Sequence, residues 1–414
     1  MSFVSLLFFY FTGDVKNWLS QNFPRSIGQS YTLLLPACFL ILLALFIILK
    51  KTKSTLQSHV FIINLALLLF ISADLIQIFL KDPKSEYKIA SESEKNLPTC
   101  DTCSPPDIFY IIFDAYTSSE YLNSRFGYSN SDVEDDLKSK GFIIIPRSRS
   151  NYNFTPYSIG SILNMNYIEN VDTSSKNFDR AYMQALNLVY ENRICSLLLK
   201  KNYVLFNHSI FDIEAFPSTL QGFDPWNLKD FFDQYNLLLK FNLDIGKYPP
   251  FFFISNPAKR LRFDSTVYHH LMESAKLKLS QPKFIYAHFL RPHPPYFFDS
   301  LGQDLKPAPV TNKDGYLHQI AYSNKLIKKI TDSIITYAQK PLVIIIQGDH
   351  GISFTDPANS QDYFPNFNAL YFSTKDYKSL NDSMSSVNTF RVVMNSFFKR
   401  DLELLPDHFF FVRF

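Results

Sequence analysis

The amino-acid sequence predicts an α/β protein in which helices flank a mostly parallel sheet and two transmembrane helices precede it. Three observations lead to this fold class. Short, fully apolar runs end in polar residues, as is typical of strands buried on both faces of a parallel sheet. Segments with apolar residues at helical spacing separate these runs, so strands and helices alternate along the chain. Two long apolar segments come before all of them.

The two apolar segments are Tyr31–Leu49 and Val60–Leu80, and each approaches the ~20 residues that a membrane-spanning helix requires. The stretch between them contains three lysines, which indicates a cytoplasmic loop. We therefore expect residues 31–80 to form two transmembrane helices and everything after Lys81 to lie outside the cytoplasm. Two buried helices of a soluble protein are the alternative, but adjacent runs of this length are hard to bury. Residues 1–30 are expected to be an apolar stub, too short to span, and a polar segment.

Composition excludes one class of function and supports another. The formal net charge is +3 and no basic stripe is present, which excludes a nucleic-acid-binding protein. Aromatic residues make up 16% of the chain, including 42 Phe, whereas charged residues make up only 19%. Together with the two apolar segments, this composition indicates contact with a membrane. We expect a protein of the cell (inner or plasma) membrane whose large domain is extracytoplasmic.

A polar, charged stretch marked by prolines, residues 81–106, is predicted to be a linker. The outer domain would then comprise residues 107–414. Cys100 and Cys103 lie at the end of the linker, and in an oxidising compartment they would form a local disulfide. A zinc site would need a second cysteine pair, which the sequence lacks.

The outer domain contains the alternation of strands and helices on which the fold class depends. Three apolar runs are predicted strands: Ile108–Phe113, Phe284–Phe289 and Leu342–Ile346. Helical spacing marks Asp179–Lys200, which leads into the apolar stretch "YVLFN", and Tyr316–Tyr337. Residues 221–264, which are rich in Phe, Pro and Asn, are expected to form an irregular insertion.

Groups that bind metals or move protons stand at the ends of the predicted strands. In open α/β sheets, functional groups gather beyond the carboxyl ends of the strands. Here that edge collects two carboxylates and three imidazoles: Asp114, His288, His293, Asp349 and His350. Taken singly, each residue has an ordinary interpretation as a turn or cap. Together they provide the oxygen and nitrogen ligands that Zn²⁺ or Mn²⁺ coordinate, which favours these ions over Ca²⁺ or Mg²⁺.

Thr155, in the segment "SNYNFTPYSIGSILNMNYIE", is the candidate nucleophile. A hydroxyl bound to a dication loses its proton readily and becomes an effective nucleophile. A helix that starts after Thr155 would also direct backbone N–H groups toward a bound anion. The alternative is a helix cap, with Thr155 at the N-cap and Pro156 at the first helical position. The two roles are compatible, because a hydroxyl at a helix start is well placed for both.

Five segments together resemble the membrane-anchored, sulfatase-like branch of the alkaline phosphatase superfamily, which includes lipoteichoic acid synthases and phosphoethanolamine transferases. The segments are "PDIFYIIFDAY", "SNYNFTPYSIGSILNMNYI", "HFLRPHPPYFFD", "IIIQGDHG" and "VNTFRVVMNSFF". They occur in the family's order and cover the chain from about Pro106 to its C-terminus. The resemblance implies an alkaline phosphatase/sulfatase-like fold. The first ligand position, often Glu in the transferases, is Asp here, as on the phosphatase side of the superfamily.

The resemblance also implies a set of site residues. A divalent metal would be held by four residues: Asp114, Thr155, Asp349 and His350. His293 would contact the substrate phosphate or a second metal, and His288 is the other histidine suited to substrate binding. We expect a metal-dependent hydrolase or transferase of phosphate esters on cell-envelope glycans or lipids, with a phospho-Thr intermediate and His293 as proton donor. Arg147 and Arg149 are candidates for guiding an anionic substrate, with solvated surface charge as the alternative.

Two other functions stay open. A sulfuric ester hydrolase of the formylglycine type, acting on sulfated glycans or lipids, needs Cys or Ser in a C/S-x-P-x-R setting. Thr155 carries a methyl group on its β-carbon, so the same oxidation would give a ketone, and no Arg follows at the required spacing. The other alternative is a catalytically silent protein of envelope assembly. The intact set of candidate ligands argues against that alternative.

Overall fold

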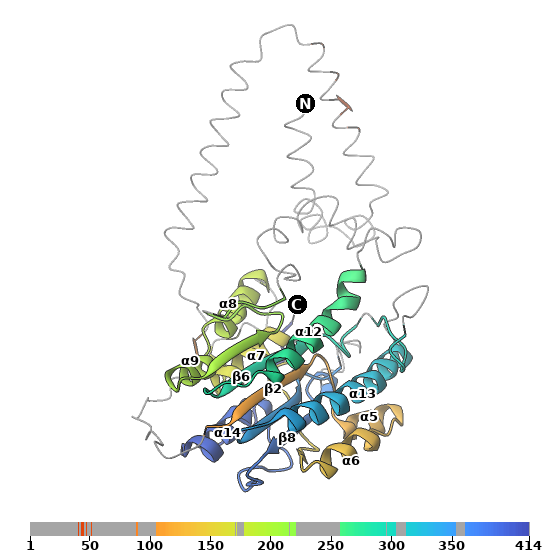
Figure 1. Ribbon diagram of the computed structural model, residues 1–414. Coiled ribbons are helices and arrows are strands. Elements are labelled where there is room, and N and C mark those ends of the chain that lie inside the picture. Colours follow the sequence, from red (N-terminus) through yellow and green to blue (C-terminus); the bar gives the residue numbers. More distant parts are fainter. Residues whose placement is uncertain are drawn as a thin grey trace, which may run out of the picture. The chain divides into compact units, whose positions relative to one another are not determined.

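The computed structural model describes residues 105–169, 171, 178–214, 216–220, 257–294, 296–303, 312–352 and 361–413, with isolated positions before residue 90. The chain divides into two compact units, and the described sheet lies in the unit formed by Ser85–Phe223 and Ala258–Phe414 (Figure 1). The predicted transmembrane helices, the N-terminal stub and the Cys100–Cys103 pair lie outside the described residues. Within the described ranges, no helix combines the length and hydrophobicity needed to cross a membrane.

A six-stranded sheet forms the centre of this unit, with the strand order β3–β8–β7–β2–β6–β5. The strands are β2 (Asp107–Phe113), β3 (Ile143–Ile144), β5 (Val204–His208), β6 (Lys283–Phe289), β7 (Leu342–Gly348) and β8 (Asn368–Phe372). β2 pairs in parallel with both β6 and β7, and β5 pairs in parallel with β6. β8 runs antiparallel to both of its neighbours, β7 and β3. The predicted α/β fold with a mostly parallel sheet is confirmed, and β8 makes the sheet mixed.

The central strands are apolar on both faces because each face covers a separate core. All seven residues of β2, of β6 and of β7 are buried. In β2, Ile108, Tyr110 and Ile112 belong to one hydrophobic cluster. The alternate residues Phe109 and Ile111 belong to the other. This two-fold alternation of side chains explains why the run shows no polar face in the sequence.

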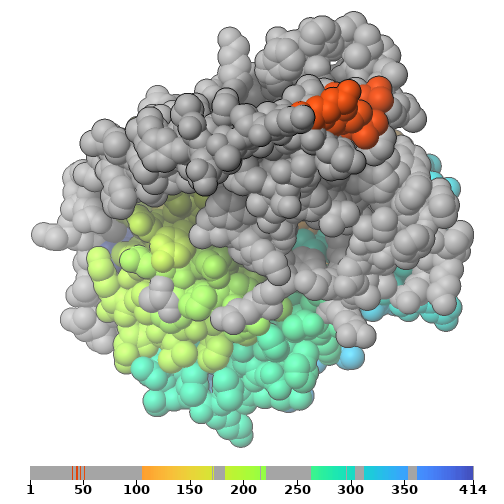
Figure 2. Space-filling view, turned by 90° about the horizontal axis from the view of Figure 1, so that it is seen from above, coloured from red at the N-terminus to blue at the C-terminus, as the bar shows by residue number. Residues whose placement is uncertain are grey.

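Helices cover both faces of the sheet (Figure 1). One cluster contains residues of α7 (Thr155–Asn164), α9 (Arg193–Lys200) and α14 (Thr389–Phe398), and α8 (Phe178–Tyr190) packs on α7. The other cluster contains residues of α5 (Ser119–Phe126), α6 (Ser131–Ser139), α12 (Pro257–Lys276) and α13 (Lys313–Tyr337). The surface over residues 178–220 adjoins the surface of the segment that begins with α12 (Figure 2), in keeping with the pairing of β5 with β6. A short two-stranded sheet, β1 (Lys88–Ile89) with β4 (Ile168–Glu169), completes the strands of the described residues.

Two expectations about helices need correction. The single helix predicted over Asp179–Lys200 is wrong, because the segment forms α8 and α9. The break falls at Asn192, whose side chain accepts a hydrogen bond from Cys195 N at 2.9 Å and so caps α9. The irregular insertion is wrong over 257–264, which belongs to α12, while residues 221–256 lie outside the described ranges. The helix predicted over Tyr316–Tyr337 is confirmed as α13.

Residues 402–412, which follow α14 and which we call the strap, are fastened by asparagine side chains. Asn395 bonds to both the N–H and the C=O of Leu402, at 2.9 and 2.8 Å. Asn388, in the 3-10 helix η3 (Ser386–Asn388), does the same to Leu405 at 2.8 and 2.9 Å. Asn153 does so to Val412 at 2.7 and 3.0 Å. We call each of these asparagines an amide clip. Each clip satisfies the N–H and the C=O of one strap residue, as a neighbouring strand would do in a sheet.

Candidate metal centre

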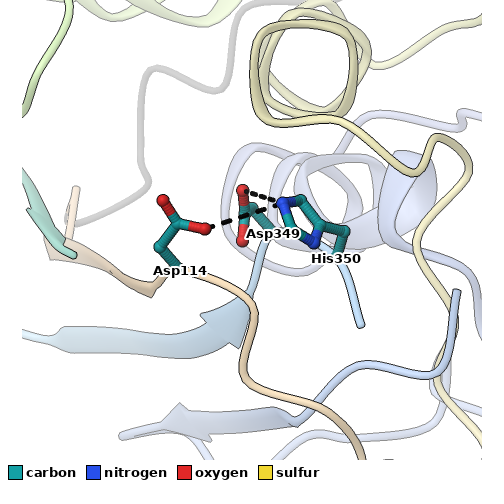
Figure 3. A group of neighbouring side chains, drawn as sticks. All are labelled: Asp114, Asp349 and His350. Carbon is teal, nitrogen blue, oxygen red and sulfur yellow. Dashed lines mark ion pairs between the residues drawn. The ribbon is translucent and has the colours of Figure 1, made fainter. Parts of the chain in front are cut away.

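Four predicted site residues meet at the carboxyl ends of β2 and β7. Asp114 follows β2, Asp349 and His350 follow β7, and Thr155 is the first residue of α7. Ligand atoms of Asp114, Asp349 and His350 all lie within 4.8 Å of one another (Figure 3). His350 Nε2 lies 3.6 Å from Asp114 Oδ1, 3.5 Å from Asp349 Oδ2 and 3.3 Å from Thr155 Oγ1. The imidazole nitrogen is therefore the point around which the three oxygen donors gather.

Strand register and a tight turn place the two carboxylates. Phe113 and Gly348 are partners in the β2–β7 ladder, so Asp114 and Asp349 leave the sheet at the same level. Ala115 then adopts a positive φ of 60°, and its N–H donates to Asp349 Oδ1 at 2.9 Å. A β-carbon at Gly348 would overlap the Tyr116 carbonyl oxygen, so only glycine lets this turn lie against β7.

The helix-cap interpretation of Thr155 is wrong. The N-cap position of α7 is Phe154, which is extended, and Thr155 is already helical, with Pro156 next in the first turn. Ser158 Oγ, one turn further on, donates to the carbonyl oxygen of Asp349 at 2.5 Å and fastens the start of α7 to the loop after β7. Because the Thr155 hydroxyl contacts His350 instead of capping the helix, it belongs to the site.

The residues present fit a divalent metal. Asp114 Oδ1 and Asp349 Oδ2 are buried and accept no hydrogen bond from the described residues, although buried carboxylate oxygens nearly always have partners. His350 Nδ1 lies 2.9 Å from Gly351 O, and a carbonyl oxygen can only accept. Nδ1 therefore carries the proton, and Nε2 offers a lone pair toward the two carboxylates. A cation between these atoms would satisfy all of them.

Electrostatics keep Asp114 ionised, as a cation ligand must be, and create a negative field that favours positive charge at this centre. Burial alone would raise the pKa of the Asp114 carboxyl, but the imidazoles of His293, His288 and His350 outweigh it and bring the pKa to about 2. Burial opposes protonation of His350, but Asp349, Asp114 and the Gly351 carbonyl raise the pKa of His350 above its usual value. The site thus holds a strong negative potential around one imidazole.

His288 and His293, at the end of β6 and in the loop after it, occupy different places. His288 is fully buried in β6, with Nε2 3.9 Å from Asp114 Oδ2 and Nδ1 3.0 Å from the Tyr286 hydroxyl. It is therefore placed to support Asp114 rather than to contact a substrate. His293 is half-buried, its Nδ1 donates to Pro294 O at 2.6 Å, and its ring centroid lies 6.5 Å from that of His350. His293 stands at the rim of the centre, within reach of a group bound there.

Sequence reasoning missed the residue that anchors the His293 loop. Asp264, in α12, accepts a hydrogen bond from Leu290 N at 2.8 Å and pairs with Arg291 Nε at 2.5 Å. The pair is buried, so it fixes the start of the loop after β6. Nothing in the sequence distinguishes this aspartate from an acid on the solvent side of a helix.

Arg147 and Arg149 lie between β3 and α7, and neither is one of the clustered ligands. Arg147 is exposed and Arg149 is half-buried, and both line a cavity of about 390 Å³. They therefore border a surface pocket that is open to solvent.

The sequence matches the Sulfatase family over residues 148–392, a range that contains every candidate ligand except Asp114. A search of curated proteins finds no match. Among solved structures, the chain is similar to the C-terminal periplasmic domain of EcEptC from Escherichia coli in complex with Zn. The sequence identity is 12% and the TM-score is 0.45, and the match covers 76% of this chain and 85% of that chain. It is similar to lipooligosaccharide phosphoethanolamine transferase A from Neisseria meningitidis, with 11% identity, coverage of 76% and 57%, and a TM-score of 0.43. It is also similar to a putative sulfatase from Bacteroides thetaiotaomicron, with 11% identity, coverage of 72% and 72%, and a TM-score of 0.45.

The family match includes the α7 segment, the turn after β6 and the loop after β7, which carry the site. The resemblance that we inferred from the sequence is thereby confirmed at the level of the family. Because the match spans more than half of the chain, the protein belongs to the sulfatase family of enzymes.

Proposed function

We propose that this sulfatase-family enzyme is a metal-dependent hydrolase or transferase of phosphate esters with Thr155 as its nucleophile. One observation carries the proposal: the Thr155 hydroxyl lies 3.3 Å from His350 Nε2, beside two buried carboxylates with unsatisfied oxygens. When bound by Asp114, Thr155, Asp349 and His350, a divalent ion would lower the pKa of the hydroxyl and offset charge on phosphoryl oxygens. The donor set favours Zn²⁺ or Mn²⁺.

Thr155 would act in two steps. Its alkoxide oxygen forms a bond to phosphorus while the bond between phosphorus and the leaving oxygen breaks, which gives a phospho-Thr intermediate. Water or an acceptor hydroxyl then attacks phosphorus and releases Thr155, so the reaction is a hydrolysis or a transfer. The first turn of α7 supports the anion, since its backbone N–H groups and helix dipole favour negative charge at Thr155.

His293 would protonate the leaving oxygen. The closeness of its ring to that of His350 supports this role, and an imidazole titrates near neutral pH. His288 and Asp264 would act as positioning residues, the first beside Asp114 and the second beneath the His293 loop.

The family name makes a sulfuric ester hydrolase the second candidate. Formylglycine chemistry requires an aldehyde that hydrates to the nucleophile, and a threonine cannot give one because its β-carbon bears a methyl group. The residue that would be modified is Thr155, which already touches His350. Phosphate therefore fits this site better than sulfate.

Cell-envelope glycans or lipids that carry phosphate are the substrates that we propose. Residues 31–80 would anchor the chain in the cell membrane, and residues 107–414 would form the extracytoplasmic catalytic domain after the linker 81–106. The support for this arrangement is the pair of apolar segments and the lysines between them.

The test uses the full-length protein with Mn²⁺ or Zn²⁺ and three model substrates: a phosphomonoester, a phosphodiester and a sulfate ester. We expect turnover of a phosphate ester, and Thr155→Ala should lower kcat by roughly 10³-fold or more. Mass spectrometry of a quenched reaction should find phosphate on Thr155. Full activity of Thr155→Ala, or turnover of the sulfate ester alone, would overturn the proposal.

A further inference from the structure

A cavity of about 390 Å³ is bordered by three segments of the chain. They are residues 118–124 at the start of α5, residues 146–149 before α7, and residues 361–365 before β8. This volume falls within the roughly 300–1,000 Å³ that is usual for small-molecule sites. Neither the proposed reaction nor the metal centre uses the side chains that line it.

Each wall of the cavity is joined to a segment that carries a site residue. Residues 118–124 follow Asp114 closely in the chain, and Thr117 Oγ1 donates to Pro365 O at 2.9 Å. Arg149 forms an isolated antiparallel bridge with Pro365 and lies on the segment that leads to Thr155. These connections join two walls of the cavity to the segments that carry the first ligand and the proposed nucleophile.

The third wall is tied to the loop after β7. Gly351 N donates to Tyr363 O at 2.7 Å, and Ile352 N donates to Asp362 O at 3.2 Å, directly after His350. The cavity therefore shares its framework with all three parts of the metal centre.

The lining carries balanced charge. Arg147 and Arg149 contribute two guanidinium groups, and Glu120 and Asp362 contribute two carboxylates. A second anionic group would gain little here, because the carboxylates offset the attraction of the arginines. An acyl chain is also a poor fit, since it would strip water from four charged groups without replacing their hydrogen bonds.

The lining combines a side chain held by other residues with two charged side chains that are not. Arg149 is held by a hydrogen bond of 2.6 Å to Gln361 and by stacking of its guanidinium 4.2 Å from the Phe409 ring centroid. The side chains of Arg147 and Glu120, by contrast, make no hydrogen bond or ion pair with any described residue. A strong donor and a strong acceptor are thus available to a ligand.

We propose that the cavity binds a sugar unit of the substrate, a neutral and hydroxyl-rich group, next to the phosphate at Thr155. A sugar hydroxyl donates and accepts at once, so it suits a lining that offers both guanidinium and carboxylate groups. The ring of Tyr121 and two prolines supply apolar surface for the C–H face of the sugar. The inference rests on the proposed function and selects a glycan over a lipid as the substrate.

One experiment compares glucose 6-phosphate with phenyl phosphate, which lacks sugar hydroxyls, on the full-length protein with Mn²⁺. We expect Arg147→Gln and Glu120→Gln each to lower kcat/KM for the sugar phosphate, relative to phenyl phosphate, by about tenfold through KM. Arg125→Gln is the matched control, since Arg125 lies on α5 but not in the lining. An unchanged ratio between the two substrates would overturn the inference.

A second measurement separates this inference from the proposed function. Saturation-transfer NMR with phosphate-free methyl glycosides of glucose, galactose, mannose and N-acetylglucosamine needs no turnover. We expect a signal from at least one glycoside that Arg147→Gln with Glu120→Gln abolishes and Arg125→Gln retains. If neither ester is turned over, the proposed function fails, and the NMR result still decides the cavity. Absence of any signal that the double variant removes would overturn the sugar site.

Discussion

His208, at the end of the edge strand β5, is a buried histidine that the proposed reaction does not use. Its Nδ1 lies 2.8 Å from Thr219 Oγ1, and its Nε2 lies 2.8 Å from Ser274 Oγ in α12. Burial, with a smaller contribution from the neighbouring His270, lowers the pKa of His208 to about 4. The ring is therefore neutral in the folded protein at neutral pH and joins β5 to α12 through two hydroxyls.

This pKa predicts acid sensitivity. The unfolded chain has a histidine pKa near 6.5, so between pH 6.5 and 4 it binds more protons than the folded chain. The stability that neutral His208 contributes is fully present above pH 6.5 and is lost as the pH falls toward 4. We expect the free energy of unfolding to fall by about 2 kcal/mol more between pH 7 and pH 5 in wild type than in His208→Gln. Urea unfolding of the full-length protein at each pH measures this free energy. The same dependence of the free energy of unfolding on pH in both proteins would contradict the prediction.

At the scale of residues, the sequence predicted the candidate metal ligands better than the residues that hold them in position. Asp114, Asp349 and His350 were predictable because each follows an apolar run, and parallel strands bring such ends to one edge. The contact between Thr155 and His350 required the tertiary fold, since Thr-Pro alone favours a helix cap. Asp264 was not predictable, because its burial arises from the packing of α12 and not from its neighbours in sequence.

At the scale of elements, the amide clips attach the strap to the segment that carries the nucleophile. Asn153 lies two residues before Thr155 and is 2% exposed, so its two bonds to Val412 hold the chain just before α7. The clip at Asn395 has the same bonding pattern but lies beyond the end of η3, within α14. One bonding pattern therefore occurs both near the proposed nucleophile and away from it.

Replacing the two clips should separate stability from catalysis. Asn153→Ala and Asn395→Ala each leave a backbone N–H and C=O without a partner, which costs on the order of 1–3 kcal/mol of stability. Only Asn153→Ala should also lower kcat, by about tenfold, because Thr155 loses its fixed approach to His350. Denaturant unfolding and kcat of the folded fraction measure the two effects. Equal kcat values for the two variants would show that the Asn153 clip is purely structural.

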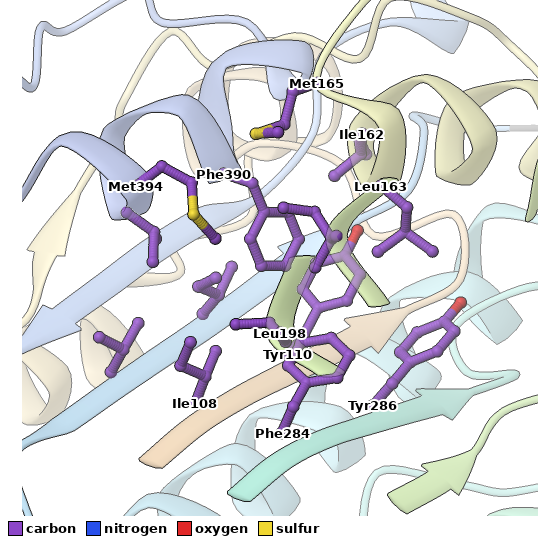
Figure 4. Close-up of a cluster of buried hydrophobic side chains, with 14 of the residues drawn as sticks. Ile108, Tyr110, Ile162, Leu163, Met165, Leu198, Phe284, Tyr286, Phe390 and Met394 are labelled. Carbon is purple, nitrogen blue, oxygen red and sulfur yellow. The ribbon is translucent and has the colours of Figure 1, made fainter. Parts of the chain in front are cut away.

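Helices and strands were predictable where their residues are completely buried. The prediction failed where a single polar residue decides the boundary of an element. β2, β6, β7 and α13 follow from their apolar patterns, and their side chains fill the two cores. Figure 4 shows Ile108 and Tyr110 of β2 beside Phe284 and Tyr286 of β6 in one of them. The break between α8 and α9 depends on the Asn192 cap, which lies inside a continuous helical pattern. β8 was missed because "NALYF" is too short to indicate a strand until β7 and β3 are there to pair with it.

At the scale of the whole molecule, the candidate metal centre connects segments that lie far apart in the sequence. Its ligands come from the end of β2, the start of α7 and the end of β7, and so from the centre of the sheet and the helix layer on one face. Without a cation, the Asp114 and Asp349 oxygens remain buried and unsatisfied. Binding should therefore stabilise the folded chain as well as serve the reaction.

Metal removal should lower the thermal stability of the protein. At a free metal concentration about 1,000 times Kd, binding contributes about 4 kcal/mol, which corresponds to a Tm shift on the order of 10 °C. Thermal unfolding with EDTA, and after re-addition of Mn²⁺ or Zn²⁺, measures the shift. Asp349→Asn should abolish the difference, because it removes one charged ligand. The same Tm with and without EDTA would rule out a metal at this centre.

The amide clips also bear on how the sequence of the strap can change over evolution. Each clip binds only the backbone N–H and C=O of Leu402, Leu405 or Val412, groups that every residue except proline provides. The path of the strap is thus encoded in asparagines that stand elsewhere in the chain. Exposed strap positions such as Glu403 and Asp407 are therefore free to vary among homologues, whereas Asn153, Asn388 and Asn395 are not.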